Sequence, residues 1–161
     1  MRSRFENVVN ARDVPQEDYS EPSGRYLVAG RELAEVVGAR DLGYSVVTIA
    51  PGSRSYPFHF HHAEEEAFYV VEGRALLRQG DGEDEDELVE LGPGDVVAFP
   101  AGTGIAHQFV NDGDAPFTYL AISNKVASDV AEFPDSDKLL IRATRQIVRR
   151  TPQLDYFDGE L

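Results

Sequence analysis

The sequence contains no cysteine among its 161 residues. Disulfide bonds, thiolate metal sites and a cysteine nucleophile are therefore excluded. No apolar run approaches the ~20 residues that a transmembrane helix requires, and the polar N-terminal segment lacks the apolar stretch of a secretory signal. We expect a cytoplasmic protein with no membrane partner.

Basic residues are also scarce, because 15 Lys and Arg stand against 29 Asp and Glu, for a formal net charge of −14. Phosphate backbones need a basic footprint on the protein that binds them, so nucleic acid is excluded as a partner. Only 2 of the bases are lysines. Salt adaptation and a GC-rich genome would each explain that balance.

Short apolar segments alternate with turn signals about every ~10 residues, which indicates an all-β sandwich or barrel rather than βαβ units. The expected strands are 42–50, 66–73, 74–79, 88–91, 95–100, 106–111 and 117–123. Gly73 between two of them predicts a hairpin. The acidic run 80–87 includes Asp81, Asp84 and Asp86, but it lacks the ligand order of an EF-hand and fits a solvated loop better than a calcium site.

The ends of the chain are less regular. Residues 31–41 fit a short helix or a turn, and residues 137–150 fit a strand or a short helix. A chain of this length is most simply one domain. We expect an N-terminal arm (1–41) that packs on the barrel or is exchanged between barrels, a barrel core (42–123) and a C-terminal extension (124–161).

Three of the four histidines lie in the stretch PFHFHHAEEEAFYVVEG, residues 57–73. In a strand His59 and His61 project to one side, and two imidazoles ~7 Å apart can converge on one metal ion. The next strand can return a carboxylate, but strand parity leaves Glu65 and Glu66 both open. Surface histidines beside an acidic turn are the alternative interpretation, and His62 fits it as a spare surface residue better than as a base beside the site.

This stretch resembles the first motif of the cupin superfamily: a glycine, His-x-His, a short gap, a glutamate, six residues and a glycine. Gly73 sets the phase of that motif and selects Glu66. The segment GDVVAFPAGTGIAHQFVN (94–111) resembles the second motif, with His107 at the fourth ligand position. One extra residue before His59 and two before His107 fall in loops. More weakly, EFPDSDKLL and YFDGE resemble a bacterial group of small single-domain cupins.

The resemblance implies a cupin-type jelly-roll barrel, also called a double-stranded β-helix, with the metal ligands His59, His61, Glu66 and His107. Such a nitrogen and oxygen set suits one divalent transition metal ion such as Mn, Fe, Ni or Zn. The ion would lie at the mouth of an apolar cavity. Its wall would come from Phe109, which shares strand parity with His107, and from Tyr56, Phe99 and Tyr119; plain core packing is the alternative for each of these aromatic residues.

Function is less determined than the fold, because one fold hosts many functions. The first hypothesis is a metal-dependent enzyme, of oxygenase, decarboxylase or isomerase type, acting on a small oxygenated molecule. The second is a non-catalytic module that senses a small molecule, and a purely structural metal is a weaker third. Arg54 and Arg78 fit solvated arginines better than substrate anchors. A homodimer that exchanges strands is expected from the resemblance.

Overall fold

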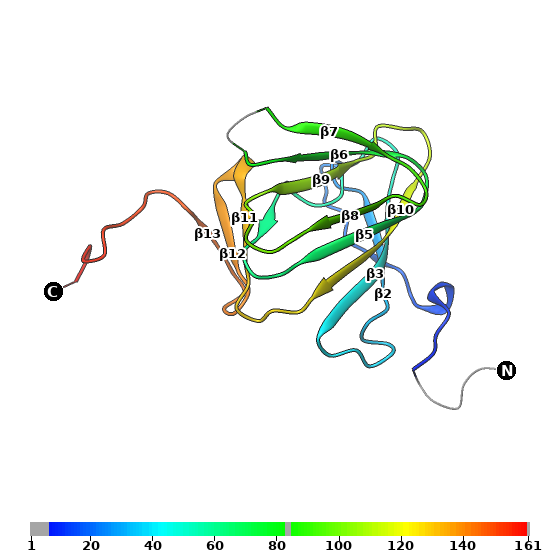
Figure 1. Cartoon of the computed structure of the whole chain (residues 1–161), viewed down its shortest axis with the longest axis horizontal. Coiled ribbons are helices and arrows are strands. Elements are labelled where there is room, and N and C mark those ends of the chain that lie inside the picture. Colours follow the sequence, from blue (N-terminus) through cyan, green and yellow to red (C-terminus); the bar gives the residue numbers. More distant parts are fainter. Residues whose placement is uncertain (1–6, 83–84, 161) are drawn as a thin grey trace.

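The structure, a computed structural model, describes residues 7–82 and 85–160. Asp84 of the acidic run lies outside the described residues. Two sheets build the barrel (Figure 1). In sheet order, the larger one contains β1 (Glu17–Asp18), β2 (Val28–Glu32), β3 (Leu42–Ile49), β10 (Phe117–Asn124), β5 (Glu66–Glu72) and β8 (Val96–Phe99). The smaller one contains β7 (Glu87–Leu91), β6 (Ala75–Gly80) and β9 (Ala106–Val110). The all-β jelly-roll expectation is confirmed.

The core lies between these two sheets and is built by side chains that alternate along the strands. In β5, Phe68 and Val70 are buried whereas Tyr69 and Val71 are exposed, as period-two patterning requires. Phe109 of β9 faces this layer, with its ring centroid 5.1 Å from that of Phe68. The buried cluster continues through Val28, Val47, Ile49, Ala75, Leu77, Leu91, Phe99, Phe117 and Tyr119.

The predicted hairpin across Gly73 is wrong. β5 pairs with β10 and β8, whereas the next strand, β6, pairs with β7 and β9 in the other sheet. Gly73 therefore carries the chain from one sheet to the other. It has φ +85, and a Cβ there would lie 2.3 Å from the Pro116 carbonyl oxygen. Only glycine meets both conditions without strain.

The N-terminal segment joins the larger sheet of the same chain. β2 pairs antiparallel with β3, β1 pairs with β2, and a 3₁₀ turn (Ala11–Asp13) precedes them. Residues 34–38 form a turn rather than a helix, in which Ala39 donates to the Ala34 carbonyl. Exchange of the arm between subunits stays a prediction.

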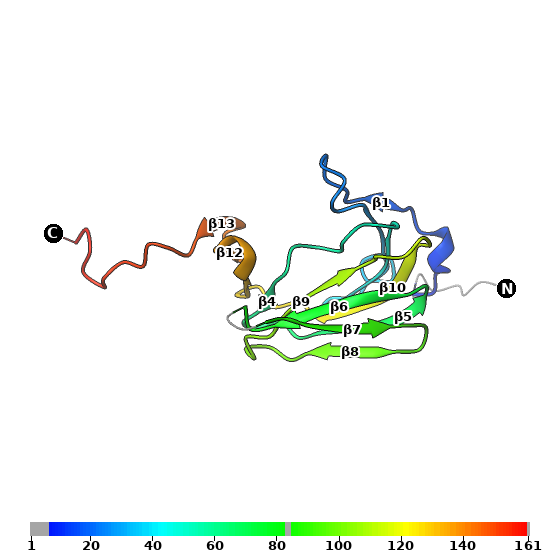
Figure 2. The same cartoon turned by 90° about the horizontal axis from the view of Figure 1, so that it is seen from above.

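The C-terminal extension builds a third sheet against the barrel. Its order is β13 (Gln146–Arg149), β12 (Lys138–Ile141), β11 (Val130–Phe133) and β4 (Phe60–His61), with a 3₁₀ turn (Pro134–Ser136) after β11. Residues 137–150 thus form two strands, so the helix alternative is wrong. Beyond Arg149 the chain leads away from the barrel (Figures 1 and 2). No helix in the described part of the chain is long and apolar enough to cross a membrane.

Candidate metal centre

Four side chains from three separate segments meet at one end of the barrel. His59 bridges to His107 of β9 by two backbone hydrogen bonds of 3.3 and 2.8 Å, which fixes these two histidines side by side. His61 lies on the short strand β4, which the extension strand β11 pairs. Glu66 begins β5 and shares its inward face with Phe68 and Val70. We call these four residues the His/Glu cluster.

The three imidazoles of the cluster all present Nε2 to the same carboxylate oxygen. Glu66 Oε2 lies 3.1 Å from His107 Nε2, 3.5 Å from His61 Nε2 and 3.9 Å from His59 Nε2. Ligands bonded to one ion at ~2.1 Å lie ~3.0–3.4 Å from one another. The observed separations are therefore close to those of a shared coordination sphere.

The hydrogen bonds on the far side of two rings decide which nitrogen carries the proton. His59 Nδ1 lies 2.7 Å from the Pro57 carbonyl oxygen, and His61 Nδ1 lies 2.6 Å from Asp129 Oδ2. Both partners accept hydrogen bonds, so both Nδ1 atoms are the donors and both Nε2 atoms bear lone pairs in the neutral rings. Histidines that ligate metals are held in this way.

Two buried polar atoms in the cluster have no hydrogen-bond partner among the described residues: Glu66 Oε2 and His107 Nδ1. The Glu66 oxygen faces two imidazole lone pairs, an arrangement that repels unless a cation lies between them. The donor set therefore fits a divalent transition metal. It contains three nitrogens, one carboxylate and no thiolate, as imidazole- and carboxylate-binding metals prefer.

The acid–base properties of the cluster favour ligation at neutral pH. Burial and then the neighbouring His107 lower the pKa of His59 to about 3. Burial would raise the pKa of Glu66, but the imidazoles, with His107 foremost, outweigh it and lower that pKa to about 2. The imidazole of His59 is thus neutral and the Glu66 carboxylate charged, the forms that bind a cation.

The cluster opens into a cavity of about 480 Å³, which we call the histidine cavity. Tyr56, Phe109 and Tyr119 line it, as do Phe68, Glu32 and Tyr44. Phe99 does not line it; its ring stacks on His107 with centroids 4.0 Å apart. Burial and then the carboxylates Glu32 and Glu66 raise the pKa of Tyr56 to about 12, so its hydroxyl stays protonated and can donate.

Two carboxylates beside the cluster were not predicted from the sequence. Asp129 is buried; its Oδ2 contacts His61 and its Oδ1 accepts from the backbone N–H groups of Ala63 and Glu64. Glu64 is buried too and pairs with Arg142. No local pattern identifies either residue, because their partners lie 68 and 78 positions away in sequence.

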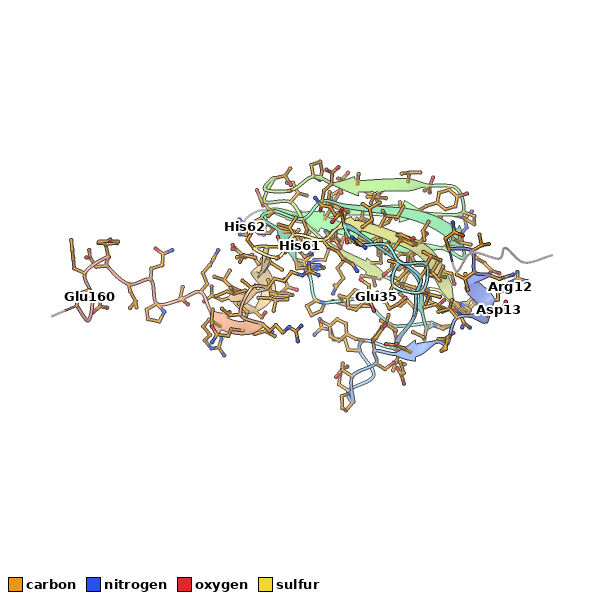
Figure 3. All side chains as sticks on the ribbon, turned by 90° about the horizontal axis from the view of Figure 1, so that it is seen from below. Arg12, Asp13, Glu35, His61, His62 and Glu160 are labelled. Atoms are coloured by element: carbon orange, nitrogen blue, oxygen red, sulfur yellow. The ribbon has the colours of Figure 1, made fainter. Side chains whose placement is uncertain are left out.

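Other side chains considered from the sequence lie outside the site. His62 is exposed, faces Glu132 and lies next to His61 on the side of the C-terminal hairpin (Figure 3). Arg78 binds Asp86 and Asp135 and covers the Phe58 ring, so it joins elements of the fold. Arg54 donates to Gln108 at 3.4 Å.

A protein-family model described as "Cupin domain" matches residues 45–123. Among solved structures, a putative sugar phosphate isomerase from Acidithiobacillus ferrooxidans is 28% identical, with a TM-score of 0.81, covering 93% of this chain and 96% of that one. A sugar phosphate isomerase from Silicibacter pomeroyi is 25% identical with a TM-score of 0.76, covering 92% and 97%.

Curated relatives match a shorter part of the chain. A glucose-6-phosphate isomerase from Thermococcus kodakarensis is 34% identical over 104 residues, which are 60% of this chain and 53% of that protein. One from Thermococcus onnurineus is 33% identical over 89 residues. The chain spans about half the length of the curated relatives it matches.

Proposed function

The chain belongs to the cupin superfamily, and from that premise we propose that it is a metal-dependent isomerase that interconverts an aldose and a ketose form of a phosphorylated sugar. The observation that carries the proposal is the convergence of three imidazole Nε2 atoms on Glu66 inside a cavity lined by both polar and apolar side chains. The sugar phosphate isomerases among its structural neighbours support the choice of reaction.

His59, His61, Glu66 and His107 would hold the ion. A divalent ion there supplies a Lewis acid that polarises a carbonyl oxygen. An open-chain sugar offers a carbonyl and an adjacent hydroxyl as two neighbouring oxygens. The isomerisation moves one hydrogen between adjacent carbons and one proton between their oxygens, so it needs no oxidant and no second substrate.

Glu32 and Tyr56 are the side chains of the histidine cavity that suit these transfers. Of the four carboxylates that line it, Glu66 belongs to the cluster, whereas Glu64 and Asp129 are bound to backbone N–H groups. Glu32 accepts only from the Tyr19 hydroxyl, at 3.2 Å, in the described part of the chain. We assign Glu32 to proton transfer at carbon and the protonated Tyr56 hydroxyl to donation to a substrate oxygen.

The test is to incubate the metal-loaded protein with glucose 6-phosphate or fructose 6-phosphate and to follow interconversion in both directions by NMR. Glu32→Gln should lower kcat by about 100-fold without changing the metal content. Glu72→Gln makes the same change at an exposed carboxylate at the end of β5; it is the matched control and should keep full activity. Binding of either sugar phosphate without conversion would contradict the enzyme and favour a sensing role.

A further inference from the structure

The C-terminal hairpin is basic in a strongly acidic protein. Residues 138–150 contain five bases and no acid, although the whole chain has a net charge of −14. These bases are Lys138, Arg142, Arg145, Arg149 and Arg150. They lie on β12, on β13, in the turn between them and, for Arg150, directly after β13, beyond the residues 45–123 that the family model matches.

Part of this charge lines a second hollow of about 600 Å³, which we call the cationic pocket. Its lining residues are Lys125, Val126, Ala127, Leu140, Arg142, Ala143 and Arg145. All three charged residues among them are cations. Lys125, Leu140 and Arg142 also line the histidine cavity, so the two spaces adjoin.

Lys125 and Arg145 in this pocket are available to bind an anion. Lys125 Nζ lies 3.9 Å from Glu35, whose side chain is 83% exposed, so that pair is weak and screened. Arg142 reaches Glu64 with Nη1. Arg145 has no ion pair with a described residue, and its backbone N–H donates to the Arg142 carbonyl, which places both arginines on one turn.

We propose that the cationic pocket is an anion site in which Lys125 and Arg145, beside Arg142, bind the phosphate group of the substrate while its carbonyl end lies at the His/Glu cluster. This inference rests on the proposed function. Guanidinium groups bind phosphate oxygens in a bidentate manner, and the lysine adds a compact point charge. Binding at both ends would orient the sugar between the two spaces.

The charge distribution of the molecule is a second argument for an anion site. Glu32, Glu64, Glu66 and Asp129 all line the histidine cavity, and the surface as a whole is acidic. A phosphorylated substrate would be repelled from most of that surface. A cationic pocket at the cavity supplies the local field that attracts it. The acidic C-terminal tail of the same chain does not occupy the cationic pocket, because Glu160 lies far from the barrel (Figure 3).

The direct test measures inorganic phosphate binding to the metal-loaded full chain by calorimetry. Lys125→Ala and Arg145→Ala should each weaken it about three- to tenfold, with the metal content unchanged. Arg149→Ala removes one charge from the same hairpin, and this exposed residue lines neither space, so it should bind phosphate like the parent protein. No detectable phosphate binding, or equal weakening by Arg149→Ala and Arg145→Ala, would overturn the proposal.

Kinetics separate this inference from the proposed function. With an active enzyme, both pocket variants should raise KM for glucose 6-phosphate and leave KM for unphosphorylated glucose unchanged. Turnover with unchanged KM would refute the anion site and leave the isomerase standing. Phosphate binding that depends on Lys125 and Arg145, with no turnover of either sugar phosphate, would refute the isomerase and leave the anion site standing.

Discussion

Asp129 Oδ2 lies 2.6 Å from His61 Nδ1, and Asp129 is buried with only 2% of its surface exposed. The same carboxylate accepts from the N–H groups of Ala63 and Glu64 through its other oxygen. One residue of the C-terminal extension therefore fixes both the ring of a candidate ligand and the loop that follows it. The extension thereby helps to build the candidate metal centre.

Asp129→Asn should weaken metal binding by about 10–100-fold. The amide replaces one acceptor oxygen by a donor and can no longer accept from both His61 and the loop. Metal affinity is measured by competition with a chelator of known strength. Asp155→Asn, in the exposed tail, is the control with the same chemical change, and an equal loss in both variants would refute the positioning role of Asp129.

Glu66→Gln should reduce metal affinity by at least ~100-fold, because a neutral amide replaces the single carboxylate of the cluster. Elemental analysis of protein purified without chelating resin measures the metal content. The neighbouring Glu65→Gln makes the same change on the exposed side of the chain and should retain the metal. Metal content that Glu66→Gln leaves unchanged would argue against this ligand set.

Gly73→Ala should lower the free energy of unfolding by about 3 kcal/mol or more. The alanine would need φ +85 and would place its Cβ 2.3 Å from the Pro116 carbonyl oxygen and 2.9 Å from Phe117 Cα. Urea denaturation monitors the change. Gly92→Ala, with no heavy atom within 4 Å of the new Cβ and no left-handed φ, should stay within ~0.5 kcal/mol of the parent protein.

Asp135→Asn should destabilise the protein slightly at neutral pH, and progressively less as the pH falls below 3.8. The hydrogen bond from Arg78 outweighs burial and lowers the pKa of Asp135 from 3.8. A carboxylate with a lowered folded-state pKa stabilises the protein above its unfolded value, and this contribution is lost as the pH falls through the folded one.

Asp135 is about half exposed, so we expect a difference of only a few tenths of a kcal/mol to ~1 kcal/mol at pH 7. Thermal unfolding measured from pH 7 to pH 3 should show the stabilities of the parent protein and of Asp135→Asn approaching each other as the pH falls. A gap that widens toward acid would contradict the assigned ion pair. The exposed Asp112→Asn should show no such pH dependence.

Local patterns predicted the strands well and their partners poorly. The alternation in residues 66–72 and the turn at Gly92–Gly94 each mark a strand boundary, and the structure has β5, β7 and β8 there. The hairpin across Gly73 failed because a glycine turn permits either pairing or crossing. Which of the two occurs depends on β8, β9 and β10, whose competing pairings no local signal describes.

The local pattern likewise predicted only part of the candidate site. Strand periodicity placed His59 and His61 together, while the choice of Glu66 and His107 came from the motif resemblance. The structure brings all four together. It also separates the aromatic candidates, since Tyr56, Phe109 and Tyr119 line the histidine cavity whereas Phe99 stacks on His107.

The sequence by itself determined the all-β architecture, the absence of thiolate chemistry and the pairing of His59 with His61, because these follow from composition and from periodicity over a few residues. Tertiary structure alone decided that Asp129 supports His61, that Arg142 meets Glu64, and that Lys125 and Arg145 share a pocket beside the histidines. These contacts join residues far apart in the chain, and only the packing of the C-terminal extension on the barrel brings them within reach.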